Sequence, residues 1–590
     1  MSEQKQAGLT GLGKVIVFVV VAGLLYLGYS FMGKKPGGDT TGQGSTTGST
    51  PVATTGGGTP GGGTGAEDTQ GQPGQVTTVQ EYAFVPEDKL PPVKGVSAYK
   101  WDAKNKVVEF PINVWIGWLP IVAANHGFAP NEQSVFFKKY GFKVNLNLID
   151  DPVVARDAYA SGQSHVLWGT LDMIVLFSDE LMKDPRTAPR VFQQVDWSSG
   201  GDGIVVRERI KSVKDLKGKT IVFAQNSPSQ YYITSLLLSA GLNPKTDVKI
   251  RYTATAFEAA AAYDSDPKID ACVSWAPDIY NLVEKRKGNR LLSSTAEANK
   301  LIADVWAVRA DFARDHPDVV YGLVAGIFEG MEMTRDPKSK TYADAVKWMA
   351  EGYSMKPEDI MGMSQDAHST NFGENKDFFL NANSPTNFER TWKSISYAYK
   401  ELGLIRGTVR FDQVMDFSVI KKLDAEGKFK EQKNENTATF APTTYGKVSA
   451  ESPVVTTVLH IQFYPNSSNL HEPARDEYGA IQKNSLYDPN VDTVIERAAK
   501  LAGQFSNARI AIVGHTDASR KGQVDENEVK ALSMQRAQAV KDELVKKFKF
   551  DPNKFVVQGA GWDVPADPED PENHFKNRRV EISVYQLEQE

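Results

Sequence analysis

The segment GHTDASRKGQVDENEVKALSMQRAQAV, residues 514–540, carries one acidic and one basic residue in a pattern that suits a ligand with both charges. Asp517 ends a strand-like apolar run, and Arg536 interrupts a helical stripe of apolar residues. An arginine on such a stripe either extends to water or meets a partner, and an aspartate at a strand end is often an ordinary loop residue. The residues alone leave these alternatives open.

Other reactive residues are sparse in the chain. The eight histidines show no pair at metal-ligand spacing, no GxSxG motif is present, and Cys272 is the single cysteine. We therefore predict no enzyme, no cofactor and no metal site. A net charge of −6 argues against a nucleic-acid partner, and 590 residues suffice for three or four domains.

The N-terminal region resembles a membrane anchor followed by a tether. Residues 15–33, VIVFVVVAGLLYLGYSFMG, carry no charge and are long enough to cross a bilayer as a helix. A cleaved signal peptide is the alternative, but the run ends in bulky residues rather than at a small-x-small site. We predict a short N-terminus (1–14), an uncleaved anchor (15–33) and a disordered Gly/Thr-rich tether (34–94).

Two folded regions are expected after the tether, a central domain (95–430) and a C-terminal domain (453–590), with a polar linker (431–452) between them. In the central domain strand-like runs such as KTIVFA and VKIRYT alternate with helical ones, which predicts two α/β lobes with parallel strands. Six tryptophans lie at or after predicted strand ends and indicate a partly aromatic cleft: Trp115, Trp118, Trp168, Trp197, Trp275 and Trp306.

The motifs WIGWLPIVAANHGF, DDPVVARDAYASGQSHVLWGTLDM, VDWSSGGDGIVV and VSWAPDIYNLVE resemble the periplasmic solute-binding proteins of the nitrate, sulfonate, taurine and thiamine-precursor group. The resemblance implies two lobes that close on a small molecule, joined by two crossing strands near 203–206 and 304–308. It implies a cleft lined by Gly117, Trp118, Gly169, Thr170, Asp172, Ser227, Ser229, Trp275 and Asp278, with Asp202 beside the hinge.

None of these positions is a lysine or an arginine. A sulfonate or nitrate would therefore rest on helix N-termini and hydroxyl groups. The aromatic residues with Asp172 and Asp278 suit a cationic or heteroaromatic ligand at least as well. The sequence does not choose between these ligands.

The C-terminal domain shows a βαβαββ pattern, a small α+β fold. The motifs GHTD, LSMQRAQAV, GAGWDVP and NRRVEI resemble the OmpA-like peptidoglycan-binding domain. The resemblance implies that Asp517 and Arg536 bind the diaminopimelate of a peptide stem, the carboxylate facing its ammonium and the guanidinium its carboxylate. Thr516, Asn577 and Arg578 are expected in the same groove, and Arg579 in a structural ion pair. Arg520 and Val529 depart from the family pattern, so the intervening loop is reshaped.

The complete prediction is a multidomain bacterial protein with an N-terminal transmembrane helix, a two-lobed α/β periplasmic-binding-protein fold and an OmpA-like α+β domain. It is placed in the inner membrane with its bulk in the periplasm. Expected partners are peptidoglycan, a small solute, and an ABC permease or a membrane sensor. The alternative is a wall-to-membrane spacer or partner-docking protein whose solute-binding fold has no small ligand.

Overall fold

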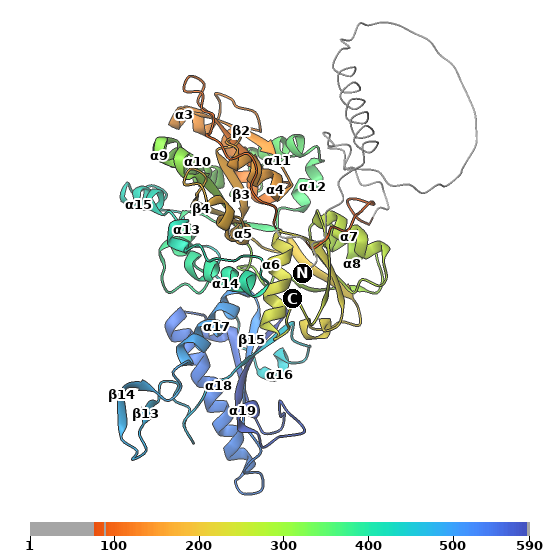
Figure 1. The fold of residues 1–590 in the computed structure, drawn as a ribbon, viewed down its shortest axis with the longest axis vertical. Helices are drawn as coiled ribbons and strands as arrows, with labels where there is room; N and C mark the ends of the chain where they lie inside the picture. Colours follow the sequence, from red (N-terminus) through yellow and green to blue (C-terminus); the bar gives the residue numbers. More distant parts are fainter. Residues whose placement is uncertain (1–75, 88–89, 587–590) are drawn as a thin grey trace, which may run out of the picture. The chain divides into compact units, whose positions relative to one another are not determined.

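The computed structural model describes residues 76–87 and 90–586 (Figure 1), which belong to one compact unit. The predicted anchor at 15–33 and the tether up to residue 75 lie outside the described residues. Within the ranges described, no helix combines the length and the apolar character needed to cross a membrane.

The first lobe contains two sheets. Strands β1 and β2 pair in parallel, and a second sheet has the order β11-β4-β10-β3 with antiparallel pairing throughout. The strands are β1 (Val107–Ile112), β2 (Lys143–Leu148), β3 (Val166–Thr170), β4 (Pro189–Ser198), β10 (Ala303–Arg309) and β11 (Ala367–Ser369). The helices are α2 (Leu119–Asn125), α3 (Val135–Tyr140), α4 (Pro152–Ala160), α5 (Leu171–Leu181), α9 (Ala310–Asp315), α10 (Pro317–Met333), α11 (Lys340–Tyr353), α12 (Pro357–Gly362), α13 (Phe372–Leu380), α14 (Phe388–Glu401) and α15 (Ser418–Ala425).

The second lobe is a five-stranded sheet of order β7-β6-β8-β5-β9, in which β6 pairs in parallel with β7 and β8. Its elements are β5 (Asp202–Arg207), β6 (Thr220–Ala224), α6 (Pro228–Ser239), β7 (Lys249–Thr253), α7 (Ala256–Ser265), β8 (Ala271–Trp275), α8 (Asp278–Glu284) and β9 (Asn289–Ser294). Thr255 and Glu258 form a capping box that fixes the start of α7. Two α/β lobes with parallel strands were expected, although both lobes also contain antiparallel pairs.

Between β1 and α15 the chain crosses between the lobes twice, at 199–201 and at 295–302. The positions expected from the resemblance, 203–206 and 304–308, instead lie inside β5 and β10, one in each lobe. Thr295 ties the two crossings together, because its hydroxyl accepts the backbone N–H of Gly200 at 2.9 Å and of Asp202 at 3.1 Å. The two crossings are therefore held side by side.

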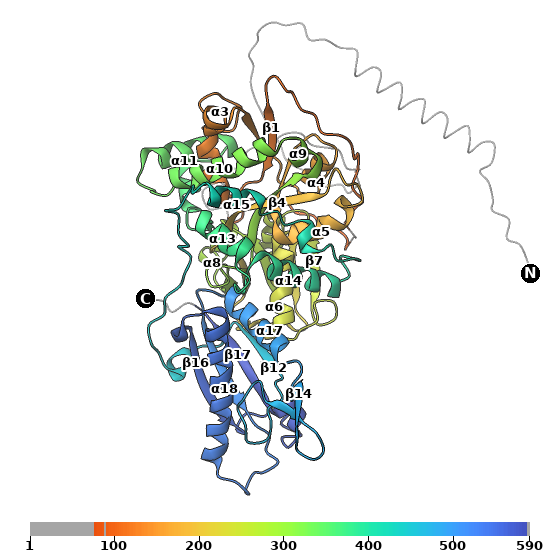
Figure 2. The ribbon, with the colours of Figure 1, turned by 90° about the vertical axis from the view of Figure 1, so that its left-hand side faces the viewer.

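The C-terminal domain has the predicted βαβαββ order with one additional hairpin. Its four-stranded sheet has the order β12-β17-β15-β16, and the long helix α18 lies along it (Figures 1 and 2). The elements are α16 (Tyr445–Val448), β12 (Val455–Leu459), β13 (Pro473–Arg475), β14 (Ile481–Leu486), α17 (Val491–Gln504), β15 (Arg509–His515), α18 (Glu526–Phe548), β16 (Phe555–Gly561), α19 (His574–Asn577) and β17 (Arg579–Tyr585). The unexpected hairpin is β13–β14.

The tether was predicted to extend to residue 94, but the structure shows packed residues before that point. Val76 is buried in a cluster of the second lobe, and the backbone N–H of Val85 donates to the carbonyl of Tyr252 at 2.9 Å. The predicted linker is also partly packed, because the backbone N–H of Asn436 donates to Glu374 at 3.1 Å. Both corrections have the same cause, which is that a few apolar and amide groups in these polar stretches find partners on the folded lobes.

Candidate functional site

Five buried aspartates meet where the two lobes join, and we call them the interlobe acid cluster: Asp172, Asp196, Asp202, Asp304 and Asp366. Strand register brings them together, because Asp304 at the start of β10 stands opposite Thr170 on β3 and Asp196 on β4. Asp202 opens β5 directly after the first crossing, so the second lobe also contributes a carboxylate.

Asp196 is enclosed by the loop that precedes α2. Its carboxylate accepts the indole N–H of Trp115 at 3.2 Å, and Gly117 lies against it. A Cβ at position 117 would lie 1.8 Å from a carboxylate oxygen of Asp196. Only glycine therefore allows the loop to approach the carboxylate this closely.

Three of the other carboxylates, those of Asp202, Asp366 and Asp172, accept hydrogen bonds from hydroxyl groups. Ser198 Oγ donates to Asp202 at 2.7 Å, Tyr280 OH to Asp366 at 2.8 Å, and Tyr399 OH to Asp172 at 2.8 Å. Tyr280 lies on α8 of the second lobe, whereas Asp366 precedes β11 of the first. This last hydrogen bond therefore joins the lobes across the site.

Burial raises the pKa of every carboxyl group in the cluster. It raises the pKa of Asp196 and Asp202 to about 7 and that of Asp172 and Asp366 to about 6. Burial and the neighbouring charge of Asp196 raise the pKa of Asp304 well above its usual value. Removing a carboxylate from water and placing like charges beside it both favour the protonated form. The cluster therefore retains protons near neutral pH.

The nine residues predicted for the cleft fall into two groups. Gly117 and Asp172 belong to the interlobe site, and Thr170 lies at the same end of the sheet. Trp118, in contrast, is buried in the core and donates its indole N–H to Asn113 at 2.8 Å. Gly169 lies under α5 against Met173 and Ile174. Ser227 precedes α6, and its hydroxyl donates to the carbonyl of Ala224. Ser229 is buried on that helix. Trp275 packs edge-on against Phe257. The predicted aromatic cleft is thus mainly core packing, with Trp115 as the tryptophan bonded to the cluster.

Asp278, the last of the nine, is contacted by the chain's own N-terminal segment. Thr78 donates its backbone N–H at 2.8 Å and its hydroxyl at 2.6 Å to one carboxylate oxygen of Asp278. Burial raises the pKa of Asp278 to about 6, although these two hydrogen bonds oppose the shift. Asp278 therefore also fixes the segment that follows the tether.

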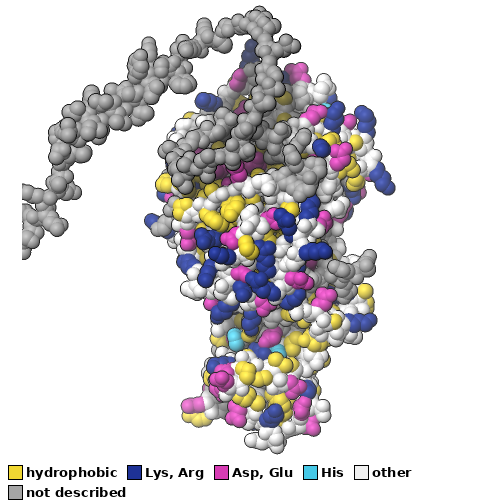
Figure 3. Space-filling view, turned by 90° about the vertical axis from the view of Figure 1, so that its right-hand side faces the viewer, with side chains coloured by type: hydrophobic (Ala, Val, Ile, Leu, Met, Phe, Trp, Pro, Cys, Tyr) yellow, Lys and Arg dark blue, Asp and Glu magenta, His cyan; other side chains and the backbone are white. Residues whose placement is uncertain are grey.

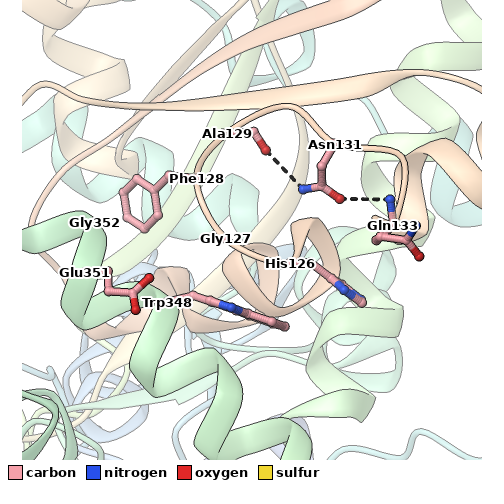
Figure 4. A pocket seen from close by; sticks show the side chains of 9 residues that line it. All are labelled: His126, Gly127, Phe128, Ala129, Asn131, Gln133, Trp348, Glu351 and Gly352. Atoms are coloured by element: carbon pink, nitrogen blue, oxygen red, sulfur yellow. Dashed lines mark hydrogen bonds between the residues drawn. The ribbon is translucent and has the colours of Figure 1, made fainter.

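A separate hollow of about 580 Å³ lies on the first lobe between the end of α2 and α11 (Figure 4). His126 stacks on Trp348 there, with ring centroids 5.1 Å apart. None of the predicted cleft residues lines this hollow. On the face drawn in Figure 3, basic and acidic side chains are interspersed.

The C-terminal domain places Asp517 directly after β15. Its carboxylate accepts the backbone N–H of Ser519 at 3.0 Å and forms an ion pair with Arg578. Burial acts to raise the pKa of Asp517, but the hydrogen bonds from Ser519 and Arg578 outweigh it and lower the pKa. The carboxylate is therefore negative at neutral pH.

Arg536 is buried on the face of α18 that packs on the sheet. Its guanidinium lies 4.8 Å from the ring centroid of Phe463, and its Nε donates to the carbonyl of Ser467 at 3.1 Å. Burial and the charge of Arg578 lower the pKa of Arg536 to about 10, whereas Asp517 raises it. Arg536, Asp517 and Arg578 thus lie within electrostatic range of one another, where the peptidoglycan-binding groove is expected.

Two further residues expected in this groove differ in their contacts. Thr516 is buried, and its hydroxyl has no hydrogen-bond partner among the residues that the structure describes. Asn577 is fully buried and engages Ala566, Asp567, Asp570 and Asn573 through its amide, so it shapes the loop instead of offering a free donor. The structural role expected for Arg579 is confirmed by its 2.6 Å ion pair with Glu581.

The site prediction missed Asp196, Asp304 and Asp366, and it named Trp115 only among the six tryptophans of the expected aromatic cleft. One signal was present in the sequence, because the apolar runs VFQQVDWS and IADVWAV each contain a single aspartate. A charged residue inside a strand that is otherwise buried usually has a functional or paired role. Asp366 gave no such signal, because its run is polar.

The family comparisons match the two folded regions separately. The NMT1-like family matches residues 111–350, and the OmpA family matches residues 462–579. Residues 111–350 are therefore similar to the NMT1-like family, and residues 462–579 are similar to the OmpA family. These are the two families that the motifs indicated.

Individual relatives match one region each. Outer membrane protein Omp38 of Acinetobacter baumannii is 35% identical over 127 residues, which is 21% of this chain and 30% of the relative. The taurine-binding periplasmic protein of Escherichia coli K12 is 27% identical over 203 residues, 34% of this chain and 60% of the relative. The periplasmic aliphatic sulphonate binding protein of Escherichia coli, a solved structure, has a TM-score of 0.39 and 18% identity, covering 52% of this chain and 91% of that one. The chain thus spans less than two thirds of both curated relatives.

Proposed function

We propose that this protein is a periplasmic solute-binding receptor of the sulfonate and nitrate type that also binds peptidoglycan non-covalently. The observation that carries the proposal is that one chain joins a buried polar site between two lobes to a groove with opposite charges. Matches to the NMT1-like and OmpA families support the two halves. No catalytic step is part of the proposal.

The wall-binding half rests on the charged groove. The free end of diaminopimelate carries an ammonium beside a carboxylate, and Asp517 and Arg536 offer the complementary charges. Arg536 uses Nε for Ser467, so its two terminal amino groups remain for a ligand carboxylate. Arg578 forms an ion pair with the Asp517 carboxylate, and the ligand ammonium would share that carboxylate.

A sedimentation experiment tests the wall-binding half. Full-length protein should sediment with sacculi whose stem peptides contain diaminopimelate, and free diaminopimelate should compete. Sacculi with lysine at that stem position should bind more weakly, because lysine lacks the second carboxylate. Equal sedimentation with both sacculi would reject diaminopimelate recognition.

In this proposal the solute-binding half is held at the inner membrane by the N-terminal segment. Residues 15–33 would anchor the chain, and the tether would let the folded domains sample the space beside the membrane. The bound solute would pass to an ABC permease or be reported to a membrane sensor. Thermal unfolding of full-length protein with a solute panel tests this half, because a ligand that binds the folded state raises its stability.

The spacer function stays as a second candidate, and one observation favours it. Thr78 occupies an oxygen of Asp278, a residue expected to face the solute, which reduces the polar surface left for a ligand. A spacer predicts sacculus binding with no solute hit. A receptor predicts both.

A further inference from the structure

In the part of the chain that the structure describes, the interlobe acid cluster has no lysine or arginine to balance its charge. Among the described residues, none of its five carboxylates takes part in an ion pair with lysine or arginine. The imidazole of His368 lowers the pKa of Asp196, but it is already engaged by Glu374 at 2.7 Å. Buried carboxylates are normally paired or bound to a cation.

Two carboxylate oxygens in the cluster also lack a hydrogen-bond donor within residues 76–87 and 90–586. They are Asp202 Oδ1 and Asp366 Oδ2, and the two residues are only 4% and 3% exposed. A buried acceptor without a donor costs free energy that a ligand donor would recover. The Tyr280 hydroxyl and the first crossing bring these residues to one place, since Tyr280 bonds both Asp366 and the carbonyl of Gly200 at 2.8 Å.

Two helix N-termini beside the site do not favour an anion. A helix N-terminus attracts negative charge; the first turn of α6 has no acidic residue, but α5 already has Asp172 in its first turn and α8 has Asp278. An oxyanion placed at the start of α5 or α8 would meet these carboxylates and the rest of the cluster.

We propose that the interlobe site takes an organic cation, a ligand with a protonated amine or guanidinium group, and that Asp202 and Asp366 accept its hydrogen bonds. This assignment rests on the proposed solute-binding function and names its ligand class. The cation supplies the donors that the two unpaired oxygens lack and the positive charge that the cluster lacks. Trp115 and Tyr280 line the same place and provide aromatic surface.

Binding of a cation would be linked to proton release. A bound positive charge favours ionised carboxylates, so protons held by Asp196 and Asp202 at pH 6 would leave when the ligand enters. Amine affinity should then rise between pH 5.5 and pH 7.5, whereas the affinity for an oxyanion should fall. The titratable groups that face the cluster are Asp172 on α5, Asp196 on β4, Asp202 on β5, Asp304 on β10, Asp366 and His368 at β11, Tyr231 and Tyr232 on α6, Tyr280 on α8 and Tyr399 on α14.

Isothermal titration calorimetry on the full-length protein tests the assignment. The probes are agmatine and spermidine as amines, ethanesulfonate and nitrate as oxyanions, and Mg²⁺, Ca²⁺ and Zn²⁺ as metal ions. Titrations at pH 6 in two buffers of different ionisation enthalpy measure the protons released. We expect an amine to bind with proton release, and at least tenfold more tightly at pH 7.5 than at pH 5.5.

Matched variants locate the binding. Asp202→Asn keeps the shape and removes one charge, so it should fold and weaken amine binding at least tenfold. Asp488→Asn is the control, because Asp488 is equally buried but lies in the C-terminal domain, where it accepts the backbone N–H of Gln462 at 2.9 Å. The control should bind the amine as the parent protein does.

The outcomes separate this inference from the proposed function. An oxyanion that binds with proton uptake, or a metal ion that binds in place of the amines, overturns the ligand class and leaves the receptor function intact. Amine binding that survives Asp202→Asn combined with Asp366→Asn overturns the site. Binding by none of the three ligand classes overturns both the inference and the receptor function.

Discussion

Replacing Arg536 by lysine separates the shape of the guanidinium from its charge in the wall-binding groove. Lysine keeps the positive charge but provides a single ammonium instead of a planar fork. In the structure the guanidinium packs 4.8 Å from the ring centroid of Phe463 and is oriented by the carbonyl of Ser467. Both features set the plane in which its two terminal amino groups would meet a carboxylate.

The expected loss follows from these contacts. One charge-assisted hydrogen bond to the ligand contributes about 1.5–3 kcal/mol, whereas the contact with Phe463 lies within the protein and orients the guanidinium. Since about 1.4 kcal/mol corresponds to a factor of ten, Arg536→Lys should weaken binding roughly 10- to 150-fold. Arg536→Ala should cost about 2–5 kcal/mol, because it leaves the ligand carboxylate without a partner.

Calorimetry with a muropeptide that ends in diaminopimelate measures these losses. Lys546→Ala serves as the control, because it removes a positive charge from an exposed position in the last turn of the same helix. Thermal unfolding of each variant checks that the domain remains folded. Parent-like muropeptide affinity in a folded Arg536→Lys protein would falsify the two-pronged binding of the carboxylate.

Three further predictions concern the central domain. The pKa of about 7 for Asp196 and Asp202 lies above the unfolded value of about 4, so the folded chain holds more protons than the unfolded chain. The free energy of unfolding should therefore fall as pH rises from about 4 to about 7. A midpoint of thermal unfolding that increases over this range would contradict this prediction. Gly117→Ala places a Cβ 1.8 Å from a carboxylate oxygen of Asp196 and should lower the free energy of unfolding by about 1–3 kcal/mol. Gly362→Ala is the control, because its Cβ would meet no described atom within 4 Å. Equal unfolding midpoints for the two variants would refute the close approach at Gly117. Thr78→Val removes a 2.6 Å hydrogen bond worth about 1 kcal/mol, so backbone amides of 76–87 should exchange about fivefold faster, and unchanged exchange would show that the segment is held elsewhere.

Much of the architecture follows from the sequence because it depends on local periodicity. Runs such as KTIVFA and VKIRYT became β6 and β7, and the apolar stripe of 532–548 became the buried face of α18. The charged groove also depends on local motifs, since Asp517 follows one strand and Arg536 lies in the next helix. Family motifs then identified both domains, as the NMT1-like and OmpA matches confirm.

Only the tertiary structure brought the interlobe acid cluster together. Its aspartates come from positions 172 to 366, and strand pairing sets Asp304 beside Asp196 although 108 positions separate them. Periodicity cannot encode such long-range register, because it reports only which face of an element is buried. The same limit applies to Thr78, whose contact with Asp278 joins a polar stretch to a helix 200 residues away. The sequence by itself thus determined the elements and the two domain types, while side-chain packing across the lobe crossings decided which charges meet.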